Sequence, residues 1–285
     1  MTNIAILHPG RMGAAVAAQA IRTDTHVRWC PAGRSQATRE RADTYGLEPI
    51  DILPKLMAGS DVTISLCPPS AADDVARSVA DSGFRGLYVE ANAITPERAQ
   101  RIADDLGQHG ITVVDGCIFG APPGPDSTVR LYLAGDPAGV RTISDLFTGS
   151  QVEPVAMNGS VGQASAIKLA QASYQKASRA LAAVAYALAD HYGVRDELQQ
   201  ESQNFARSAL TAPNYLPSVA ARAWRWAPEM AETASALHTA GLPDDLARGA
   251  ETVFKLMAQA KDDYNIPLED VLAMLTPGQS DETAP

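Results

Sequence analysis

The stretch that decides the fold is ILHPGRMGAA, residues 6–15, near the start of the chain. An apolar, strand-like run leads into it, and an alanine-rich, helix-forming run follows it. Gly10 and Gly13 have the spacing of the last two glycines of a dinucleotide-binding loop, while His8 stands where the first glycine belongs. Such a loop aims the free N–H groups of the next helix at a pyrophosphate. The predicted cofactor-binding residues here are His8, Pro9, Gly10, Arg11, Met12 and Gly13.

The two glycines that remain occupy the positions with the closest contacts. The middle glycine of such a loop lets the backbone approach a phosphate, and the last lets the helix pack closely on the strand. His8 is expected to replace the first glycine with a negative φ, and Pro9 then pre-sets the turn. We therefore expect Gly10→Val to abolish dinucleotide binding and His8→Gly to leave most of it.

Short apolar runs alternate with helix-forming segments through the first half of the chain. This βαβα order predicts a parallel sheet with helices on both faces. Two later runs, at residues 129–134 and 152–156, are expected to add further strands and are open to antiparallel pairing. The strand-like runs lie at residues 4–7, 27–30, 62–67, 87–90 and 112–115.

The character of the sequence changes after residue 161. Residues 162–193 are strong helix formers without an internal glycine or proline, which predicts a helix longer than is usual in globular proteins. The remaining segments are also helical in pattern and are separated by prolines. The predicted fold is α/β: a Rossmann-type, doubly wound domain at 1–161, joined by the long helix to an all-α domain at 162–285.

Composition argues against several classes of protein. The net charge of −10 and the pI of about 4.9, without a Lys/Arg-rich run, argue against nucleic-acid binding. No apolar run approaches the roughly 18 residues that span a bilayer, and the N-terminus lacks the features of a signal peptide. Cys30, Cys67 and Cys117 are too far apart for a local metal site. We expect a cytoplasmic protein with no metal.

The segment WCPAGRSQATR, residues 29–39, follows the second predicted strand and distinguishes the two nicotinamide cofactors. An acidic residue here binds the ribose 2′-OH of NAD, whereas an arginine accommodates the 2′-phosphate of NADP. The segment has no acid but offers Arg34, Ser35 and Arg39. A guanidinium beside a hydroxyl suits a phosphate dianion, so NADPH/NADP is favoured over NADH/NAD.

Together these segments resemble the β-hydroxyacid dehydrogenase superfamily, which includes 6-phosphogluconate dehydrogenase, 3-hydroxyisobutyrate dehydrogenase and the imine reductases. The resemblance covers nearly the whole chain, and the subgroup that it matches best is the 6-phosphogluconate dehydrogenase-like NAD(P)-binding proteins with a distinctive helical C-terminal domain. Its motifs are HPGRMGAAVA at 8–17, LCPPSAADDVA at 66–76, VEANAITP at 89–96, GSVGQASAIKLAQ at 159–171 and AWRWAPEMAE at 223–232.

The resemblance implies a cofactor contact from Cys67 and Pro68, with Asn92 near the nicotinamide. It also places Lys168 beside the reacting carbon, with Gln171 one helical turn further where the superfamily usually has asparagine. Hydride delivery to a carbonyl leaves negative charge on oxygen, which needs a proton donor or a cation. Lys168 is the predicted acid/base, and Gln171 is the predicted substrate contact beside it.

Two departures from the superfamily argue against a small hydroxyacid or sugar-phosphate substrate. In VVDGCIFGAPP, residues 113–123, Phe119 replaces a serine and Cys117 a proline. In the C-terminal domain Met230 belongs to a segment that lacks the usual cation. We expect a more apolar substrate pocket, formed by Phe119, Gly120, Trp224 and Met230.

The leading hypothesis is an NADPH-dependent oxidoreductase acting on a small-molecule carbonyl or alcohol. Imine reduction is the first alternative, but imine reductases usually have aspartate or tyrosine at the Lys168 position, and a cationic lysine repels a protonated imine. The apolar Phe119 weakens this preference for a carbonyl substrate over an imine. A non-catalytic nucleotide-binding protein is the second alternative. The resemblance also implies a homodimer through the helical domain, with no nucleic-acid or membrane partner.

Overall fold

The computed structural model of the chain describes residues 1–21, 25–203, 213–224, 226–228, 230, 234, 238 and 241–275. In the long helix it gives no side-chain description at 173, 175–177, 179–187 and 190. The chain divides into two compact units, Met1–Gln171 and Ala172–Pro285. This division falls inside the long helix, later than the boundary at 161/162 that the sequence predicts.

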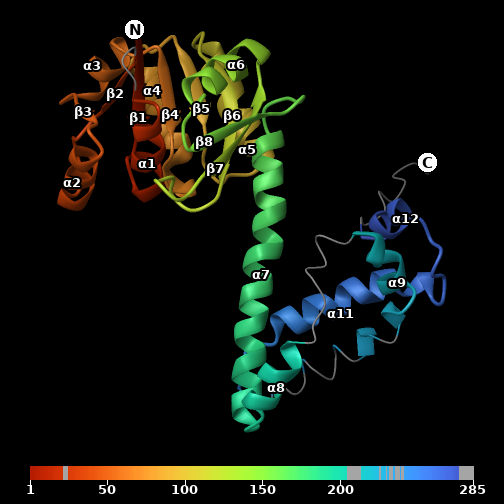
Figure 1. Cartoon of the computed structure of the whole chain (residues 1–285). Helices are drawn as coiled ribbons and strands as arrows, with labels where there is room; N and C mark the ends of the chain where they lie inside the picture. The colour runs from red at the N-terminus through yellow and green to blue at the C-terminus, as the bar shows by residue number, and fades with distance from the viewer. Residues whose placement is uncertain are drawn as a thin grey trace, which may run out of the picture. The chain divides into compact units, whose positions relative to one another are not determined.

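The first unit is built on one eight-stranded sheet with the order β3-β2-β1-β4-β5-β6-β7-β8 (Figure 1). From β3 to β6 the neighbouring strands are parallel, β7 is antiparallel to β6, and β8 is parallel to β7. The predicted α/β class is confirmed. The strands are β1 Thr2–Leu7, β2 Thr25–Trp29, β3 Glu48–Pro49, β4 Val62–Ser65, β5 Leu87–Glu90, β6 Thr112–Phe119, β7 Val129–Gly135 and β8 Val152–Ala156.

Two strands differ from the sequence prediction by more than two residues at an end. The prediction misses β3, because its two residues are both exposed and give no apolar pattern. β6 continues beyond the predicted end at Asp115 to Phe119, since its second half pairs with β7 through Gly116↔Leu133 and Phe119↔Arg130. The end of β6 therefore extends past the end of β5, whose last residue, Glu90, pairs with Asp115.

Alternating side chains of β1 connect two apolar layers, one on each face of the sheet. Ile4 and Ile6 belong to a layer that also contains residues of α1 and α6, while Ala5 and Leu7 belong to a layer with residues of α3, α4 and α5. Helices thus cover both faces. They are α1 Arg11–Gln19, α2 Gln36–Thr44, α3 Leu53–Ala58, η1 Pro69–Ala71, α4 Ala72–Asp81, α5 Pro96–Gln108 and α6 Pro137–Leu146.

The long helix α7, Gln163–His191, confirms the helix predicted at 162–193. In the second unit a small core forms around Ala220, Met257 and Val271, with Phe254 packed against it. None of the helices in the described part of the chain is long and apolar enough to cross a membrane. The other described elements are α8 Arg195–Ser202, η3 Pro213–Tyr215, α9 Leu216–Ala220, α11 Asp245–Met257, η4 Ala258–Ala260 and α12 Leu268–Ala273.

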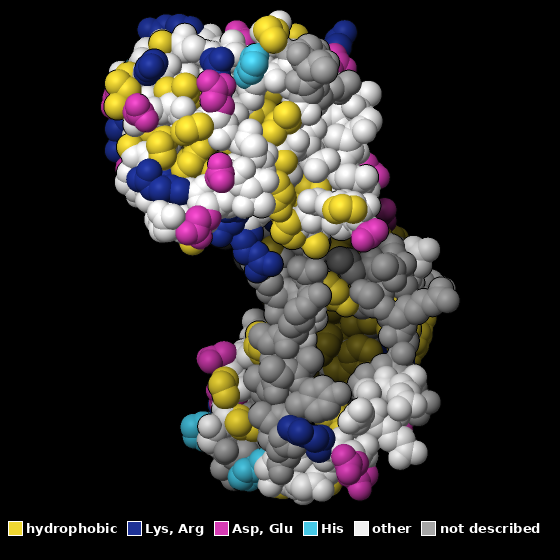
Figure 2. Space-filling view, turned by 60° about the vertical axis from the view of Figure 1, so that its left-hand side comes forward, with side chains coloured by type: hydrophobic (Ala, Val, Ile, Leu, Met, Phe, Trp, Pro, Cys, Tyr) yellow, Lys and Arg dark blue, Asp and Glu magenta, His cyan; other side chains and the backbone are white. Residues whose placement is uncertain are grey.

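Charges of both signs are interspersed on the first unit. On the face shown in Figure 2, Lys and Arg side chains lie among Asp and Glu side chains, with apolar patches between them. The ion pairs Arg28–Glu48 and Arg77–Asp74 bridge opposite charges on this unit, each at 3.2 Å. Such exposed pairs contribute little to stability.

Buried polar side chains gather where the parallel strands end. Glu90, the last residue of β5, has no exposed surface. The main-chain N–H of Asn92 donates to its Oε1 at 3.0 Å, and the Tyr88 hydroxyl donates to its Oε2 at 3.4 Å. Burial raises the pKa of Glu90 to about 7, because neither neighbour supplies a positive charge.

Glu90→Gln is therefore expected to stabilise the protein at alkaline pH. The folded chain holds the Glu90 proton with a pKa of about 7 against an ordinary 4.5, so stability falls as pH rises from about 4.5 through 7. Glutamine stays neutral, and we expect a free energy of unfolding higher by about 1–3 kcal/mol at pH 8 and little changed at pH 5. Thermal unfolding at both pH values measures this.

Glu153→Gln, on the exposed part of β8, is the matched control and should show no such pH dependence. A Glu90→Gln protein that melts below the wild type at pH 8 would contradict the raised pKa of Glu90.

Candidate cofactor and active site

The turn after β1 has the backbone that glycine usually provides. His8 has a φ of 66°, in the left-handed region, so the expected negative φ is wrong. For a residue with a Cβ this conformation costs about 1–2 kcal/mol, although histidine tolerates it better than most. A tight turn centred on Pro9 follows directly, in which the Gly10 N–H donates to the His8 oxygen at 2.7 Å.

The two glycines of the loop differ in what the protein requires of them. A Cβ on Gly13 would lie 2.9 Å from the main-chain oxygen of His8, so α1 packs against the turn only because this residue is glycine. A Cβ on Gly10 would meet the same oxygen at 3.9 Å, an ordinary contact distance. Gly10 is thus not required by the protein's own packing, which leaves room there for a ligand.

The N-terminal turn of α1 is available to an anion. Gly10 is the N-cap residue, and no side chain among the described residues caps this helix. The N–H groups of Arg11, Met12 and Gly13 lie in the first turn, where an α-helix has no internal acceptors. A phosphate group at this place would receive hydrogen bonds and the favourable end of the helix dipole.

A cavity of about 280 Å³ brings three separate segments of the sequence together at this turn. It joins the loop after β1 to the start of α2 and to the segment after β4. Thr38 and Leu66 are the lining residues that the sequence prediction did not name, although both lie within the segments quoted for the cofactor. The lining residues are His8, Gly10, Arg11, Met12, Gly13, Arg34, Thr38, Leu66, Cys67 and Pro68.

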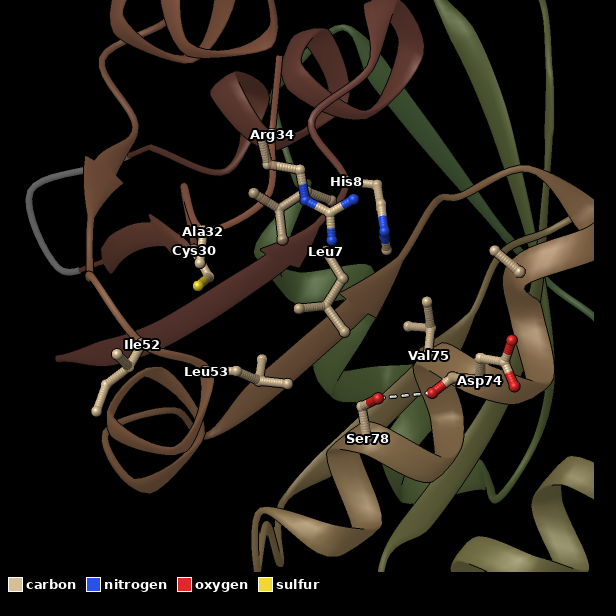
Figure 3. A pocket seen from close by; sticks show the side chains of 12 residues that line it. Leu7, His8, Cys30, Ala32, Arg34, Ile52, Leu53, Asp74, Val75 and Ser78 are labelled. Atoms are coloured by element: carbon tan, nitrogen blue, oxygen red, sulfur yellow. Dashed lines mark hydrogen bonds between the residues drawn. The ribbon is translucent and has the colours of Figure 1, made fainter. Parts of the chain in front are cut away.

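A second cavity, of about 430 Å³, shares His8 and Arg34 with the first (Figure 3). Its walls are mostly apolar, with Leu7, Leu53 and Val75 labelled in the view. At the edge of this second cavity the Arg34 guanidinium lies beside the His8 ring. A flat, largely apolar ring with a phosphate or hydroxyl near Arg34 would suit this cavity chemically.

The His8 ring is neutral at neutral pH. Its Nδ1 is buried and has no hydrogen-bond partner in the described part of the chain. Burial and the neighbouring positive charge of Arg34 lower the pKa of His8 to about 4. His8 is therefore a neutral wall of both cavities and not a proton carrier near pH 7.

Of the three residues predicted to recognise a 2′-phosphate, Arg34 lines both cavities. The Ser35 hydroxyl instead accepts from the Thr38 N–H at 3.3 Å and forms the N-cap of α2. Arg39 donates from Nε to the Arg34 carbonyl at 3.3 Å. Arg41, which the sequence prediction missed, donates to the Pro9 carbonyl at 3.3 Å and ties α2 to the glycine loop.

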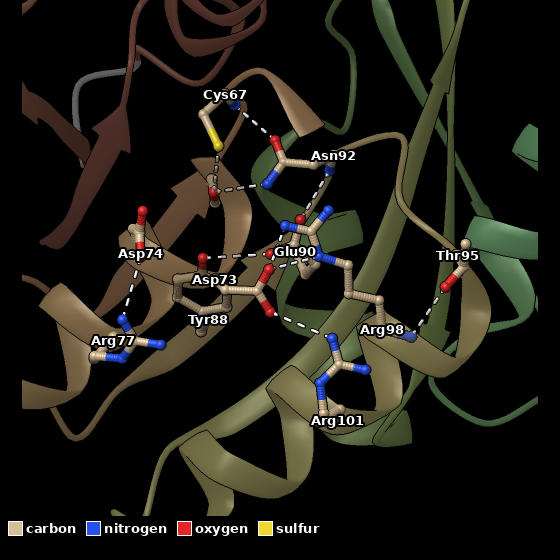
Figure 4. A network of polar contacts seen from close by, with 11 residues as sticks. Cys67, Asp73, Asp74, Arg77, Tyr88, Glu90, Asn92, Thr95, Arg98 and Arg101 are labelled. Atoms are coloured by element: carbon tan, nitrogen blue, oxygen red, sulfur yellow. Dashed lines mark hydrogen bonds and ion pairs between the residues drawn. The ribbon is translucent and has the colours of Figure 1, made fainter. Parts of the chain in front are cut away.

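Asn92 lies after β5 as predicted, and its amide is hydrogen-bonded within the protein (Figure 4). Its side chain is buried: Oδ1 accepts from the Cys67 N–H at 2.6 Å, and Nδ2 donates to the Ser65 hydroxyl at 3.0 Å. Both amide atoms thus have a protein partner, and the predicted place of Asn92 near the nicotinamide stays a prediction. Asn92 instead braces the backbone at Cys67, whose thiol pKa is raised by burial.

The start of α7 is fixed to β6 by Asp115, which is fully buried. Its Oδ2 accepts from the N–H groups of Gly162 and Ser165, each at 2.9 Å, and the Ser165 hydroxyl donates to Oδ1 at 2.7 Å. Gly162 has a φ of 100°, and a Cβ there would lie 3.1 Å from the Pro96 oxygen. The glycine of the superfamily-like motif is thus required by this junction.

Lys168 lies one helical turn beyond Ser165 and reaches back to the end of β6. Its Nζ donates to the Ile118 carbonyl at 2.5 Å and lies over the Phe119 ring, 4.6 Å from the ring centroid. Gly120 follows with a φ of 132°, and a Cβ there would lie 3.0 Å from Val129 Cγ1. Lys168, Phe119 and Gly120 are therefore brought together, and Gln171 lies half-buried one turn further along α7.

The other predicted substrate residues belong to the second unit. Trp224 is partly exposed, with the Lys261 ammonium 4.2 Å from its ring centroid, and Met230 is half-buried. A substrate pocket that joins these residues to Phe119 would combine the two units and stays a prediction. Among the described residues, no group of three or more His, Cys, Asp and Glu side chains is placed to hold a metal ion.

Comparison with known sequences gives two matches of limited extent. Residues 189–257 match the family described as Domain of unknown function (DUF1932). A protein of Methanothermus fervidus, described as an uncharacterized 28.5 kDa protein in the 7S RNA 5′ region, is 27% identical over 180 residues. That match covers 63% of this chain and 68% of the relative.

Comparison with solved structures extends over almost the whole chain. An imine reductase from Myxococcus stipitatus in complex with NADP+ has a TM-score of 0.74 at 17% identity, covering 96% of this chain and 100% of its own. The 3-hydroxyisobutyrate dehydrogenase of Mycobacterium tuberculosis, with L-serine, has a TM-score of 0.60 at 19% identity, covering 97% and 100%. The predicted resemblance is confirmed at the level of the fold: the chain has the fold of the imine reductases and 3-hydroxyisobutyrate dehydrogenases.

Proposed function

We propose that the protein is an NADPH-dependent oxidoreductase that interconverts a carbonyl and an alcohol of a small molecule. The observation that carries this proposal is the cavity in which the open turn at Gly10 and the uncapped start of α1 meet Arg34. The imine reductase of the same fold in complex with NADP+ supports the choice of cofactor. NADPH, when bound, supplies a hydride.

The loop and Arg34 divide the recognition of the cofactor between them. The N–H groups in the first turn of α1 would bind the pyrophosphate, where Gly10 leaves the backbone accessible. Arg34 would bind the 2′-phosphate, since a guanidinium forms strong, charge-assisted hydrogen bonds with phosphate oxygens. Asn92 contributes indirectly, because it holds the backbone at Cys67 in the wall of the same cavity.

Lys168 is the residue proposed to act on the substrate oxygen. During reduction the carbonyl carbon gains two electrons with the hydride, and the oxygen gains negative charge and then a proton. An ammonium beside that oxygen stabilises the charge and donates the proton from Nζ. In the direction of oxidation the resulting amine would accept the proton of the alcohol.

Imine reduction is the second candidate, and Phe119 is the observation that favours it. Its ring lies beside Lys168 and replaces the hydroxyl that would bind a substrate carboxylate in the superfamily that the chain resembles. The argument against imine reduction is that the Lys168 ammonium would repel a protonated imine. The likeness to imine reductases concerns the fold and does not decide between the two substrates.

Lys168→Met is expected to lower kcat for carbonyl reduction by about 100- to 1,000-fold with little change in NADPH affinity, because the neutral side chain neither donates a proton nor stabilises the oxygen. The measurement is NADPH oxidation with a panel of ketoacids, aldehydes and cyclic imines. Lys255→Met, which removes a lysine paired with Glu251 on α11, is the control. Imine turnover that survives Lys168→Met would contradict the mechanism, and NADPH binding without turnover would indicate a non-catalytic protein.

Gly10→Ala and Gly13→Ala are expected to fail in different ways. The first fits the protein, so it should melt near the wild-type temperature but bind NADPH at least about tenfold more weakly, because its Cβ meets the phosphate. The second places a Cβ 2.9 Å from the His8 oxygen and should lose about 1–3 kcal/mol of stability. Fluorescence titration with NADPH and thermal unfolding separate the two. Wild-type affinity in Gly10→Ala would show that the turn does not bind phosphate.

Arg34→Ala is expected to weaken NADPH binding by about 10- to 100-fold, the value of a hydrogen bond between charged groups, and to leave NADH binding nearly unchanged. Arg141→Ala, on the exposed side of α6, serves as the matched control for removal of a guanidinium. Equal losses for the two cofactors would show that Arg34 does not read the 2′-phosphate.

A further inference from the structure

The Ile118 carbonyl and the Phe119 ring both contact the Lys168 ammonium at the end of β6. The Ile118 carbonyl accepts a hydrogen bond from Nζ at 2.5 Å. The face of the Phe119 ring lies below the same nitrogen, with its centroid 4.6 Å away. The face of an aromatic ring is electron-rich and attracts a cation at this distance, so both groups favour the charged form of the lysine.

The Phe119 ring is itself held in place. It packs edge to face against Tyr132, with the ring centroids 5.3 Å apart and the planes at 77°. Both rings pack against a small apolar cluster with Cys117, Ala134 and Ala164 at its centre. Ala164 lies in the first turn of α7, so the same cluster connects the ring to the helix that carries Lys168.

A polar contact at the start of α7 also fixes the backbone that leads to Lys168. Asp115 binds the Gly162 and Ser165 N–H groups, and so sets where α7 begins on β6. Lys168 follows one turn later, while Phe119 follows Asp115 along the strand. The ring and the lysine thus approach each other from two elements that share one buried junction.

We propose that Phe119 is a positioning residue, whose ring face holds the Lys168 ammonium against the end of β6 and keeps it charged. In the superfamily that the chain resembles, a serine hydroxyl at this place would touch the substrate itself. Here the side chain acts through the lysine. Only the catalytic use of Lys168 rests on the proposed function; the contact between the ring and the ammonium does not.

The test measures the charge state of Lys168 without any turnover. Acylating reagents modify only unprotonated amines, so the modification rate of Lys168 at pH 8, divided by its limiting rate at high pH, reports how firmly the ammonium is stabilised. Peptide mass spectrometry follows Lys168 separately from the other lysines. The division by the limiting rate removes any change in access of the reagent.

Phe119→Leu and Phe119→Met, which remove the ring, are expected to raise this ratio about 3- to 10-fold. Phe119→Tyr keeps the ring and should match the wild type. Phe254→Leu is the matched control, because it removes another half-buried ring that packs edge to face, in this case on Trp226 at 5.4 Å. If one ring-less variant fails to fold, the other still provides the comparison.

A wild-type ratio in Phe119→Leu and Phe119→Met would overturn the proposal. With an active substrate, these two variants should also lower kcat about tenfold with a smaller change in KM, and Phe119→Tyr should restore it. If no carbonyl or imine is reduced by the wild type while the ratio rises as expected, the proposed function fails and the role of Phe119 stands.

Discussion

The buried carboxylate of Asp115 is the interaction on which the arrangement of the site depends. It lies on β6, and it accepts hydrogen bonds from the first turn of α7. Burying a carboxylate is costly unless its oxygens are hydrogen-bonded, and here helix N–H groups and a hydroxyl provide that. Because this junction fixes one end of a helix that continues to His191, the place of Lys168 follows from it.

The sheet and the long helix could be predicted from the sequence, since both depend on local patterns. Short sequence patterns predict each of them: the loop after β1, the strand-like runs and the uninterrupted helix formers of α7. The contacts inside the site could not be predicted so well. No motif predicts the hydrogen bonds of Asn92 with Ser65 and Cys67, which are distant from it in sequence. Arg41 has no motif, and its contact with Pro9 appears only when α2 is packed beside the loop.

His8 and Phe119 are two of the positions where this chain departs from the pattern that it resembles, and they differ in kind. At His8 the backbone keeps the left-handed turn and the side chain adds a neutral ring to the cavity wall. At Phe119 the backbone continues the strand, and the change alters the chemistry around Lys168. In a sequence pattern each of them counts as one substitution. Only the change at Phe119 alters the groups around Lys168, the proposed acid/base.

The hydrogen bond from Arg41 to the Pro9 carbonyl has a thermodynamic consequence for ligand binding. Together with the Gly10-to-His8 bond it closes the loop before any ligand arrives. The conformational entropy of these residues is lost when the chain folds, and little of it is left to lose on association. A phosphate would therefore meet a surface already in its bound shape, and the loop would contribute to fast association without an ordering step.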